Sequence, residues 1–187
     1  MEHPGEIWQE FDYNGTRLGG IKPDDYDKSK VKLFGGAAIV LYRFKNDEVE
    51  FLFQHRSEKL HDNAGKWDVS AGGHINLNES ELDTAIRETK EEIGAILKKD
   101  KLEFSAIYNR KNYALVYLYF YDWTDQPDDF HFDDQEVSEV KWVAFDQLVE
   151  FWPNLKGVLQ NDAIYQTMLL KWTKTIQEKY GNHQSKN

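Results

Sequence analysis

Three glutamates stand out in the stretch between Ser80 and Ala95 because of their spacing. Glu88, Glu91 and Glu92 are three and four residues apart, so a helix would bring their carboxylates onto one face. Each like-charged pair at that spacing costs about 0.2–0.5 kcal/mol on an isolated helix. A divalent cation such as Mg²⁺ prefers oxygen ligands and would reverse this repulsion. The spacing therefore predicts a metal site, with Glu88 and Glu92 as the first candidate ligands and Glu91 as the next.

The residues around these glutamates indicate the elements that must hold them. From Ser80 onward, small and apolar residues recur at steps of three and four, which is typical of one buried helix face: Leu82, Ala85, Ile86, Thr89 and Ile93. Gly72 and Gly73 precede this helix. Because glycine has no Cβ, its backbone can approach a bound ion closely; a simple turn is the alternative interpretation. We expect a glycine loop followed by an acidic helix.

The same stretch resembles the Nudix box, G-x5-E-x7-R-E-U-x-E-E-x-G-U, where U is a bulky aliphatic residue. Seven residues fall in register: Gly73, Glu79, Arg87, Glu88, Glu91, Glu92 and Gly94. Thr89 and Ala95 depart from the pattern, but both are packing positions. The resemblance implies an α/β fold of the Nudix type, an α/β/α sandwich around a central mixed β-sheet.

The resemblance also implies an activity and further roles. Nudix hydrolases split phosphoanhydrides in nucleoside diphosphate compounds with a divalent metal, so Mg²⁺ or Mn²⁺ is the expected cofactor and a small diphosphate the expected substrate. Arg87 would brace Glu79, and Arg87 and Glu91 are also candidate catalytic residues. Glu79 would reach the metal through water, and the Gly72 carbonyl would be a further ligand.

A general base must come from outside the carboxylates that the metal occupies. In the family it often lies on a loop or strand over the helix. Glu136, at the start of an expected strand, is the first candidate, and Glu139 is the second. Asp133 and Asp134 are more typical of solvated loop charges.

Other positions resemble the isopentenyl-diphosphate-isomerase-like branch of the superfamily. They are Glu6-Ile7-Trp8, Phe11-Asp12, Arg56, Lys59, Trp67-Asp68 and Gly73-His74, while Ala64 stands where the branch usually has proline. The resemblance makes Arg56, Lys59, His74 and Glu139 candidate substrate contacts. Surface solvation is the alternative for the two cations, and a structural role is the alternative for His74. Tyr108, Arg110 and Tyr113 either line a base or leaving-group pocket or belong to a core strand.

Three functions remain open at this point. The first is a metal-dependent hydrolase. The second is an isopentenyl-diphosphate isomerase, which uses an essential cysteine, and the chain has none. The third is a nucleotide-binding module without catalysis, although such modules usually lose box glutamates. Substrate identity lies in loops whose shape the sequence does not provide.

Composition narrows the class of protein. The 187 residues are 40% hydrophobic, enough for the core of one domain. The formal charge of −10 argues against a nucleic acid polymer as partner. The apolar runs are shorter than the roughly 18–20 residues of a membrane helix, and the start lacks a signal-peptide core. We expect a cytoplasmic protein with no membrane contact, as a monomer or a homodimer.

The remaining patterns predict the order of the elements. A hairpin is expected over residues 5–20, turning at Asn14-Gly15, followed by a loop to residue 32. Apolar runs and alternation predict strands at 35–42, 49–56, 102–109, 113–121 and 137–143, with a loop at 124–135. A short helix is expected at 145–150 and a closing amphipathic helix at 161–180, with Ile164, Met168, Leu169, Trp172 and Ile176 on one face. The expected division is 1–34 as a hairpin and loop of the same domain, 35–150 as the core, and 151–187 as the C-terminal helix.

Overall fold

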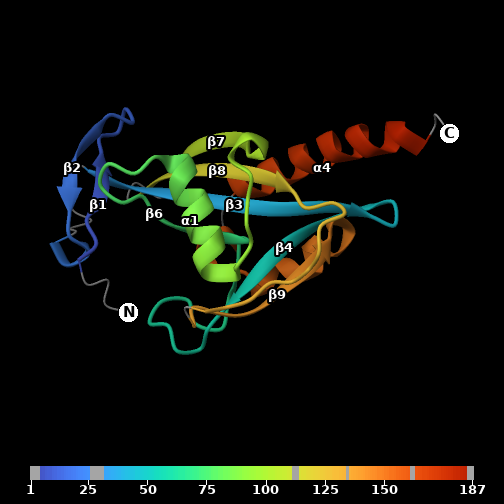
Figure 1. The fold of residues 1–187 in the computed structure, drawn as a ribbon, viewed down its shortest axis with the longest axis horizontal. Coiled ribbons are helices and arrows are strands. Elements are labelled where there is room, and N and C mark those ends of the chain that lie inside the picture. The colour runs from blue at the N-terminus through green and yellow to red at the C-terminus, as the bar shows by residue number, and fades with distance from the viewer. Residues whose placement is uncertain (1–4, 26–31, 111–113, 134, 161–162, 185–187) are drawn as a thin grey trace.

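The structure is a computed structural model and describes residues 5–25, 32–110, 114–133, 135–160 and 163–184 (Figure 1). Its elements, in chain order, are β1 (Trp8–Phe11), β2 (Arg17–Ile21), η1 (Pro23–Asp25), β3 (Leu33–Lys45), β4 (Glu48–Arg56), β5 (Trp67–Asp68), β6 (Ala71–His74), α1 (Glu81–Ile93), η2 (Lys99–Lys101), β7 (Glu103–Arg110), β8 (Ala114–Asp122), β9 (Val137–Ala144), η3 (Phe145–Gln147), α2 (Leu148–Phe151), η4 (Trp152–Asn154), α3 (Gly157–Gln160) and α4 (Ala163–Gln184).

The strands form one mixed sheet built around β3. β8 runs parallel to β3, from the pair Phe34–Ala114 to the pair Tyr42–Asp122. β1, β4 and β6 are antiparallel to β3, β7 extends the sheet beyond β8, and β9 pairs with β4. A parallel pair requires a long crossover, and α1 lies within the chain that connects β3 to β8. The expected central mixed sheet is confirmed.

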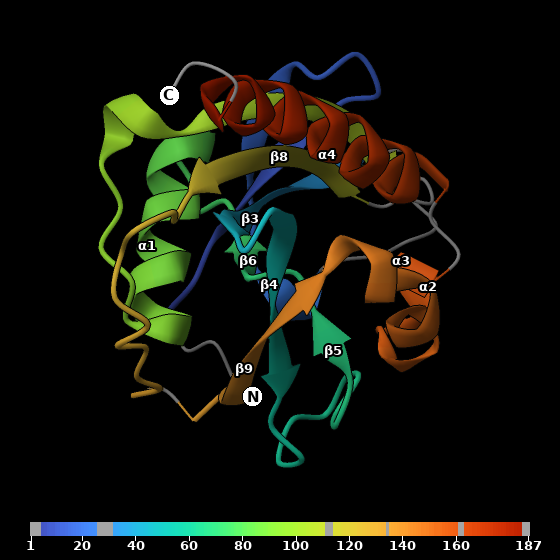
Figure 2. The same ribbon diagram turned by 90° about the vertical axis from the view of Figure 1, so that its right-hand side faces the viewer.

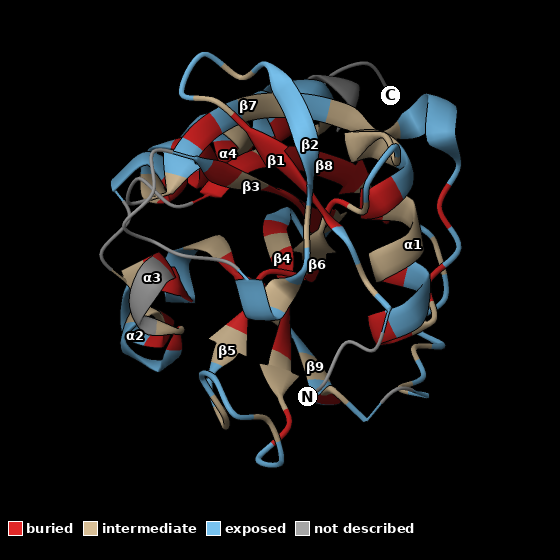
Figure 3. Cartoon of the chain, turned by 90° about the vertical axis from the view of Figure 1, so that its left-hand side faces the viewer, coloured by how far each residue is buried: buried red, intermediate tan, exposed pale blue. Residues whose placement is uncertain are grey.

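Helices cover both faces of this sheet (Figure 2). Along β3 the side chains alternate: Ile39 and Leu41 pack in the core under α1, whereas Val40 and Tyr42 pack in the core on the α4 side. Figure 3 shows how buried residues concentrate along β1, β3 and β8. Since α1 and α4 bury opposite faces of one sheet, the α/β/α sandwich is also confirmed.

Local sequence explains where α1 begins and ends. Ser80 is the N-cap, and its hydroxyl accepts a hydrogen bond from the Asp83 N–H at 3.1 Å. Gly94 ends the helix with a positive φ of 71°, which glycine adopts without a Cβ clash. Thr89 is fully buried, and its hydroxyl bonds the Ala85 carbonyl at 2.6 Å, which satisfies the polar group at this packing position.

Two expectations require correction, and two lie beyond the described residues. Gly72 and Gly73 lie in strand β6 rather than in a loop or turn, because their segment pairs with β3. Ile164 is 51% exposed, and the neighbouring Tyr165 is buried in its place. Tyr113 and Asp134 lie outside the described residues.

No described helix is both long enough and apolar enough to cross a membrane.

Candidate active site

Glu92 joins three elements at the centre of the site. Its Oε2 accepts the Gly72 N–H at 2.8 Å and the Gln54 side-chain amide at 3.1 Å. The Gly72 N–H is available because it points away from β3 in the ladder between β6 and β3. A carboxylate on α1 is thus fixed against both β6 and β4.

Gly73 allows Glu88 to lie directly over β6. A methyl group at this position would overlap the Glu88 carboxylate. At Gly72 a methyl group would instead meet the backbone of β3, 2.8 Å from the Ala37 carbonyl oxygen. Gly73 is therefore needed for the close approach of the Glu88 side chain, and Gly72 for the close approach of β3. Neither glycine has a positive φ.

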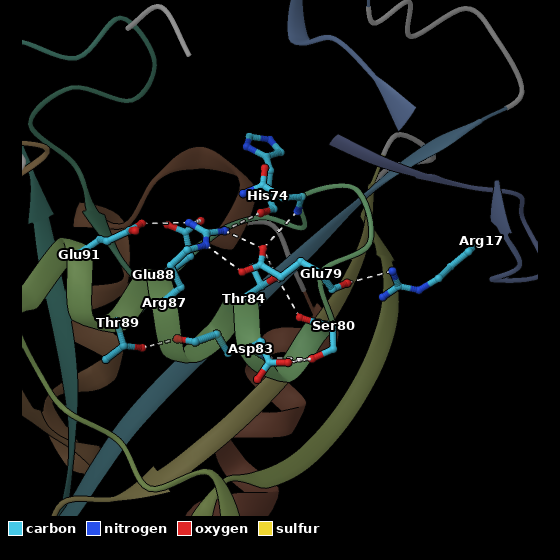
Figure 4. Close-up of polar contacts among 12 residues, drawn as sticks. Arg17, His74, Glu79, Ser80, Asp83, Thr84, Arg87, Glu88, Thr89 and Glu91 are labelled. Atoms are coloured by element: carbon cyan, nitrogen blue, oxygen red, sulfur yellow. Dashed lines mark hydrogen bonds and ion pairs between the residues drawn. The ribbon is translucent and has the colours of Figure 1, made fainter. Parts of the chain in front are cut away.

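Arg87 lies between four acceptors (Figure 4). It donates to both Glu79 oxygens at 2.9 and 3.0 Å and to the His74 carbonyl at 3.1 Å. Its Nη1 also lies 2.8 Å from Glu88 Oε1 and 2.9 Å from Glu91 Oε2. This geometry is what a brace between β6 and the start of α1 requires. Glu91 remains 52% exposed on the outer side of Arg87.

The two inner carboxylates are held in an environment that disfavours their charge. Burial raises the pKa of Glu88 to about 7, although Arg87 opposes the shift. Burial raises the pKa of Glu92 well above its ordinary value, and the charge of Glu88 adds to this effect. Hydrogen bonds from Arg87 and Thr84 outweigh burial at Glu79 and hold its pKa below the ordinary value.

These residues suit a divalent cation in their donor chemistry. Glu88 and Glu92 are hard oxygen donors, glycines open the adjacent backbone, and a cation would remove the repulsion between the two carboxylates. Within the described parts of the chain, however, no three acidic or histidine side chains come together as metal ligands. Glu88 and Glu91 instead point to Arg87.

The two base candidates lie in different surroundings. The charge of Glu136 contributes to the raised pKa of Glu92, after burial and Glu88, so Glu136 belongs to the same electrostatic cluster. Glu139 and Lys141 are two residues apart on β9 and therefore lie on the same face of the sheet. The Nζ of Lys141 is 5.8 Å from the Phe151 ring, so this is the α4 side of the sheet. The charge of Glu136 thus acts on the carboxylate site, whereas Glu139 lies on the opposite face of the sheet.

The remaining predicted substrate residues are dispersed. Arg56 donates to the Asp62 carbonyl at 3.1 Å and lies 3.8 Å from Asp68. Lys59 is exposed, and its Nζ donates to the Gln135 side chain at 3.1 Å. The His74 ring stacks on Trp8 with ring centres 3.7 Å apart.

Sequence reasoning missed Gln54 and the stacking role of Trp8. Gln54 is a buried polar residue directly after the apolar run 51–53 of β4, and that mismatch was the available signal. Tyr108 is buried in the core, whereas Arg110 is half-buried. A cavity of about 620 Å³ between η2, the end of β8 and α4 contains none of the predicted site residues.

The fold and this carboxylate site define the class of protein. The family model of the NUDIX domain matches residues 32–167, which is most of the chain. The chain belongs to the Nudix family.

Two proteins of similar sequence support the assignment to the Nudix family. The chain is 26% identical over 130 residues to the mouse bis(5'-nucleosyl)-tetraphosphatase [asymmetrical], covering 63% of this chain and 81% of that protein. It is 28% identical over 125 residues to Nudix hydrolase 3 of Arabidopsis thaliana, covering 61% of this chain but only 16% of that protein.

Solved structures share the fold. DR0079 from Deinococcus radiodurans matches with a TM-score of 0.66 at 15% identity, over 87% of this chain and 97% of that one. A C. elegans Ap4A hydrolase matches with a TM-score of 0.55 at 24% identity, over 76% of this chain and 96% of that one.

Proposed function

We propose that this protein is a metal-dependent Nudix hydrolase that cleaves the phosphoanhydride of a nucleoside di- or triphosphate or a related nucleoside diphosphate compound. The observation that carries the proposal is the pair of carboxylates, half-buried Glu88 and buried Glu92, held over Gly73 and Gly72. The names of the tetraphosphatase relatives support this substrate class.

The residues suggest how the reaction proceeds. Glu88 and Glu92, with the Gly72 carbonyl and Glu91, would hold Mg²⁺ or Mn²⁺, and Glu79 would reach it through water. When bound, the cation neutralises phosphate charge and lowers the pKa of a water molecule.

In the chemical step, one P–O bond of the anhydride breaks and water forms a new one. Glu136 would take the proton from the attacking water, and the leaving phosphate keeps the electron pair of the broken bond. Arg87 would keep Glu79 and the start of α1 in place.

The test combines catalysis with metal binding. Wild type should hydrolyse at least one member of a panel of nucleoside diphosphate derivatives with Mg²⁺ or Mn²⁺, and either cation should raise its melting temperature. The Glu88→Gln/Glu92→Gln variant should lose both responses. Without metal it should melt no lower than wild type, because the variant no longer contains two buried carboxylates that repel each other. An unchanged metal response in this variant would remove both residues from the site.

The likeness to the isomerase-like branch is a second, finer proposal. It rests on Arg56, Lys59 and the Gly73-His74 pair, whereas the mouse relative is named as a tetraphosphatase. Without a cysteine, we expect no incorporation of solvent deuterium into isopentenyl diphosphate. Metal-dependent exchange, detected by mass spectrometry, would favour the isomerase over the hydrolase.

The homodimer and the cytoplasmic location also stay predictions.

A further inference from the structure

Two cationic side chains contact one buried carboxylate, Asp68, and a third cation acts on one of them. Lys156 forms an ion pair with Asp68 Oδ2, and Arg56 Nη1 lies 3.8 Å from the same oxygen. Backbone pairing fixes this arrangement, because the Lys156 N–H donates to the Trp67 carbonyl at 2.9 Å. Figure 2 shows α2 and α3 beside β5, where this contact is made.

Arg110 is the third cation. Its charge acts on Lys156, and together with burial it helps lower the pKa of Lys156 to about 8, while Asp68 opposes the shift. The Nε of Arg110 is buried and has no hydrogen-bond partner among the described residues. A buried guanidinium nitrogen without an acceptor is costly, so this atom marks a place for an anion.

The charges in this cluster do not balance. Without the neighbouring Glu92, Arg56, Arg110 and Lys156 contribute +3 and Asp68 contributes −1, which leaves a charge of +2 on these four side chains. The chain as a whole has a formal charge of −10. Local positive charge on such a molecule attracts an anion to that one region.

The cluster lies next to the carboxylate site. Gln54 pairs with Asp68 across β4 and β5, and the Gln54 amide donates to Glu92 at 3.1 Å. Arg56 follows Gln54 by two residues and therefore lies on the same face of β4. Arg56 and Asp68 are thus neighbours of the Glu92 carboxylate.

We propose that Arg56, Arg110 and Lys156 form an anion subsite that binds a phosphate of the substrate beyond the linkage that is cleaved. The inference rests on the proposed function and deepens it. It favours substrates that carry a further charged phosphate, such as a nucleoside triphosphate or a dinucleoside polyphosphate, over compounds in which a neutral group follows the diphosphate. Arginine provides the paired N–H donors that phosphate oxygens accept.

Inorganic pyrophosphate in EDTA is the direct probe, because without metal the carboxylates repel it and only the cations attract it. We expect it to raise the melting temperature of wild type and of Glu88→Gln/Glu92→Gln alike. Arg110→Met should weaken this binding at least tenfold, and Arg110→Lys should restore part of it. Lys141→Met, which removes an exposed cation from β9, is the matched control and should bind as wild type does.

Lys156 requires a paired variant, since Lys156→Met alone would leave Asp68 buried without its partner. Asp68→Asn/Lys156→Met should fold, as judged by urea unfolding, and should also lose at least tenfold in pyrophosphate affinity. With the best panel substrate, Arg110→Met should raise KM about tenfold and leave kcat within a factor of about three.

The outcomes separate the two proposals. No pyrophosphate binding by wild type in EDTA, or equal binding by wild type and Arg110→Met, would overturn the subsite and leave the metal site untouched. Loss of binding in Arg110→Met, in a protein that hydrolyses no panel member, would support the subsite and count against the hydrolase.

Discussion

Glu136 and Glu139 are only three residues apart, yet the structure assigns them to different surroundings. Glu136 precedes β9, and its charge acts on Glu92. Glu139 lies within β9, opposite His55, on the face that Lys141 and Phe151 occupy. At the scale of single residues, distance along the chain is therefore a poor guide to proximity to the carboxylates, and strand parity is a better one.

This difference leads to a prediction about the general base. Glu136→Gln should lower kcat by about 10²–10⁴-fold with little change in KM, because the amide keeps the shape but cannot accept a proton. Its metal-induced rise in melting temperature should remain. Glu139→Gln serves as the matched control and should hydrolyse the same substrate at nearly the wild-type rate. Near-normal kcat in Glu136→Gln would move the role to Glu91.

At the scale of elements, the site depends on how closely α1 approaches β6. The Gly72 N–H and the Arg87 guanidinium connect the two elements at 2.8 Å and 3.1 Å, through Glu92 and the His74 carbonyl. These contacts require strand backbone without side chains at the crossing point. Two consecutive glycines in a strand cost stability; Glu88 fills the space at Gly73, and the backbone of β3 lies against Gly72.

Gly73→Ala tests this crossing. The added methyl would displace the Glu88 carboxylate, which is the movable end of a side chain, so the protein should still fold. We expect metal affinity and kcat/KM to fall at least about tenfold, by analogy with the loss of a positioned group. Titration of Mn²⁺ against melting temperature gives the affinity.

Gly36→Ala is the control for this prediction. It lies opposite His74 on β3, and a methyl there would meet the Gly73 carbonyl oxygen at an ordinary 3.5 Å. It should retain metal binding. Equal metal affinity in Gly73→Ala and wild type would show that Glu88 does not need this space.

At the scale of the whole molecule, α4 is attached to the sheet through residues that are distant from it in the sequence. The apolar face of α4 packs in the core. In addition, Lys179 donates to Asp122 Oδ2 at 2.8 Å, and the Tyr180 hydroxyl also donates to this oxygen. Burial alone would raise the pKa of Asp122, but hydrogen bonds from Lys179, Thr124 and Tyr180 outweigh it and hold the pKa below its ordinary value.

Stability should therefore depend on pH through Asp122. Because the pKa of Asp122 is lower in the folded protein, the unfolded chain binds the Asp122 proton more tightly than the folded protein does. The contribution of Asp122 to stability is therefore present at pH 7 and is lost as pH falls below about 4. Asp122→Asn should lower the free energy of unfolding by about 1–2 kcal/mol at pH 7. The difference from wild type should shrink at pH 3, as measured by urea unfolding.

Lys174→Met, which removes an exposed cation from the same helix, is the control and should change stability by less than about 0.5 kcal/mol. A gap between Asp122→Asn and wild type that is as large at pH 3 as at pH 7 would show that the ion pair does not stabilise α4.

The sequence alone determined the parts of this protein that depend on near neighbours. The acidic helix was predictable because residues three and four apart must share a helix face, and Ser80 and Gly94 bound it. Long apolar runs predicted β3 and β8 to within a few residues. The spacing of the box also indicated the family, which the match over residues 32–167 then showed.

Only the tertiary structure decided which distant residues meet. That Gln54 and Gly72 both donate to Glu92, and that Lys156 lies on Asp68, depends on pairings between segments separated by about 20 to 90 positions along the chain. The orientation of Glu139 depends on the register of β9 against β4. A shift of one residue would turn every side chain of a strand to the opposite face, and nothing local in the sequence encodes that register.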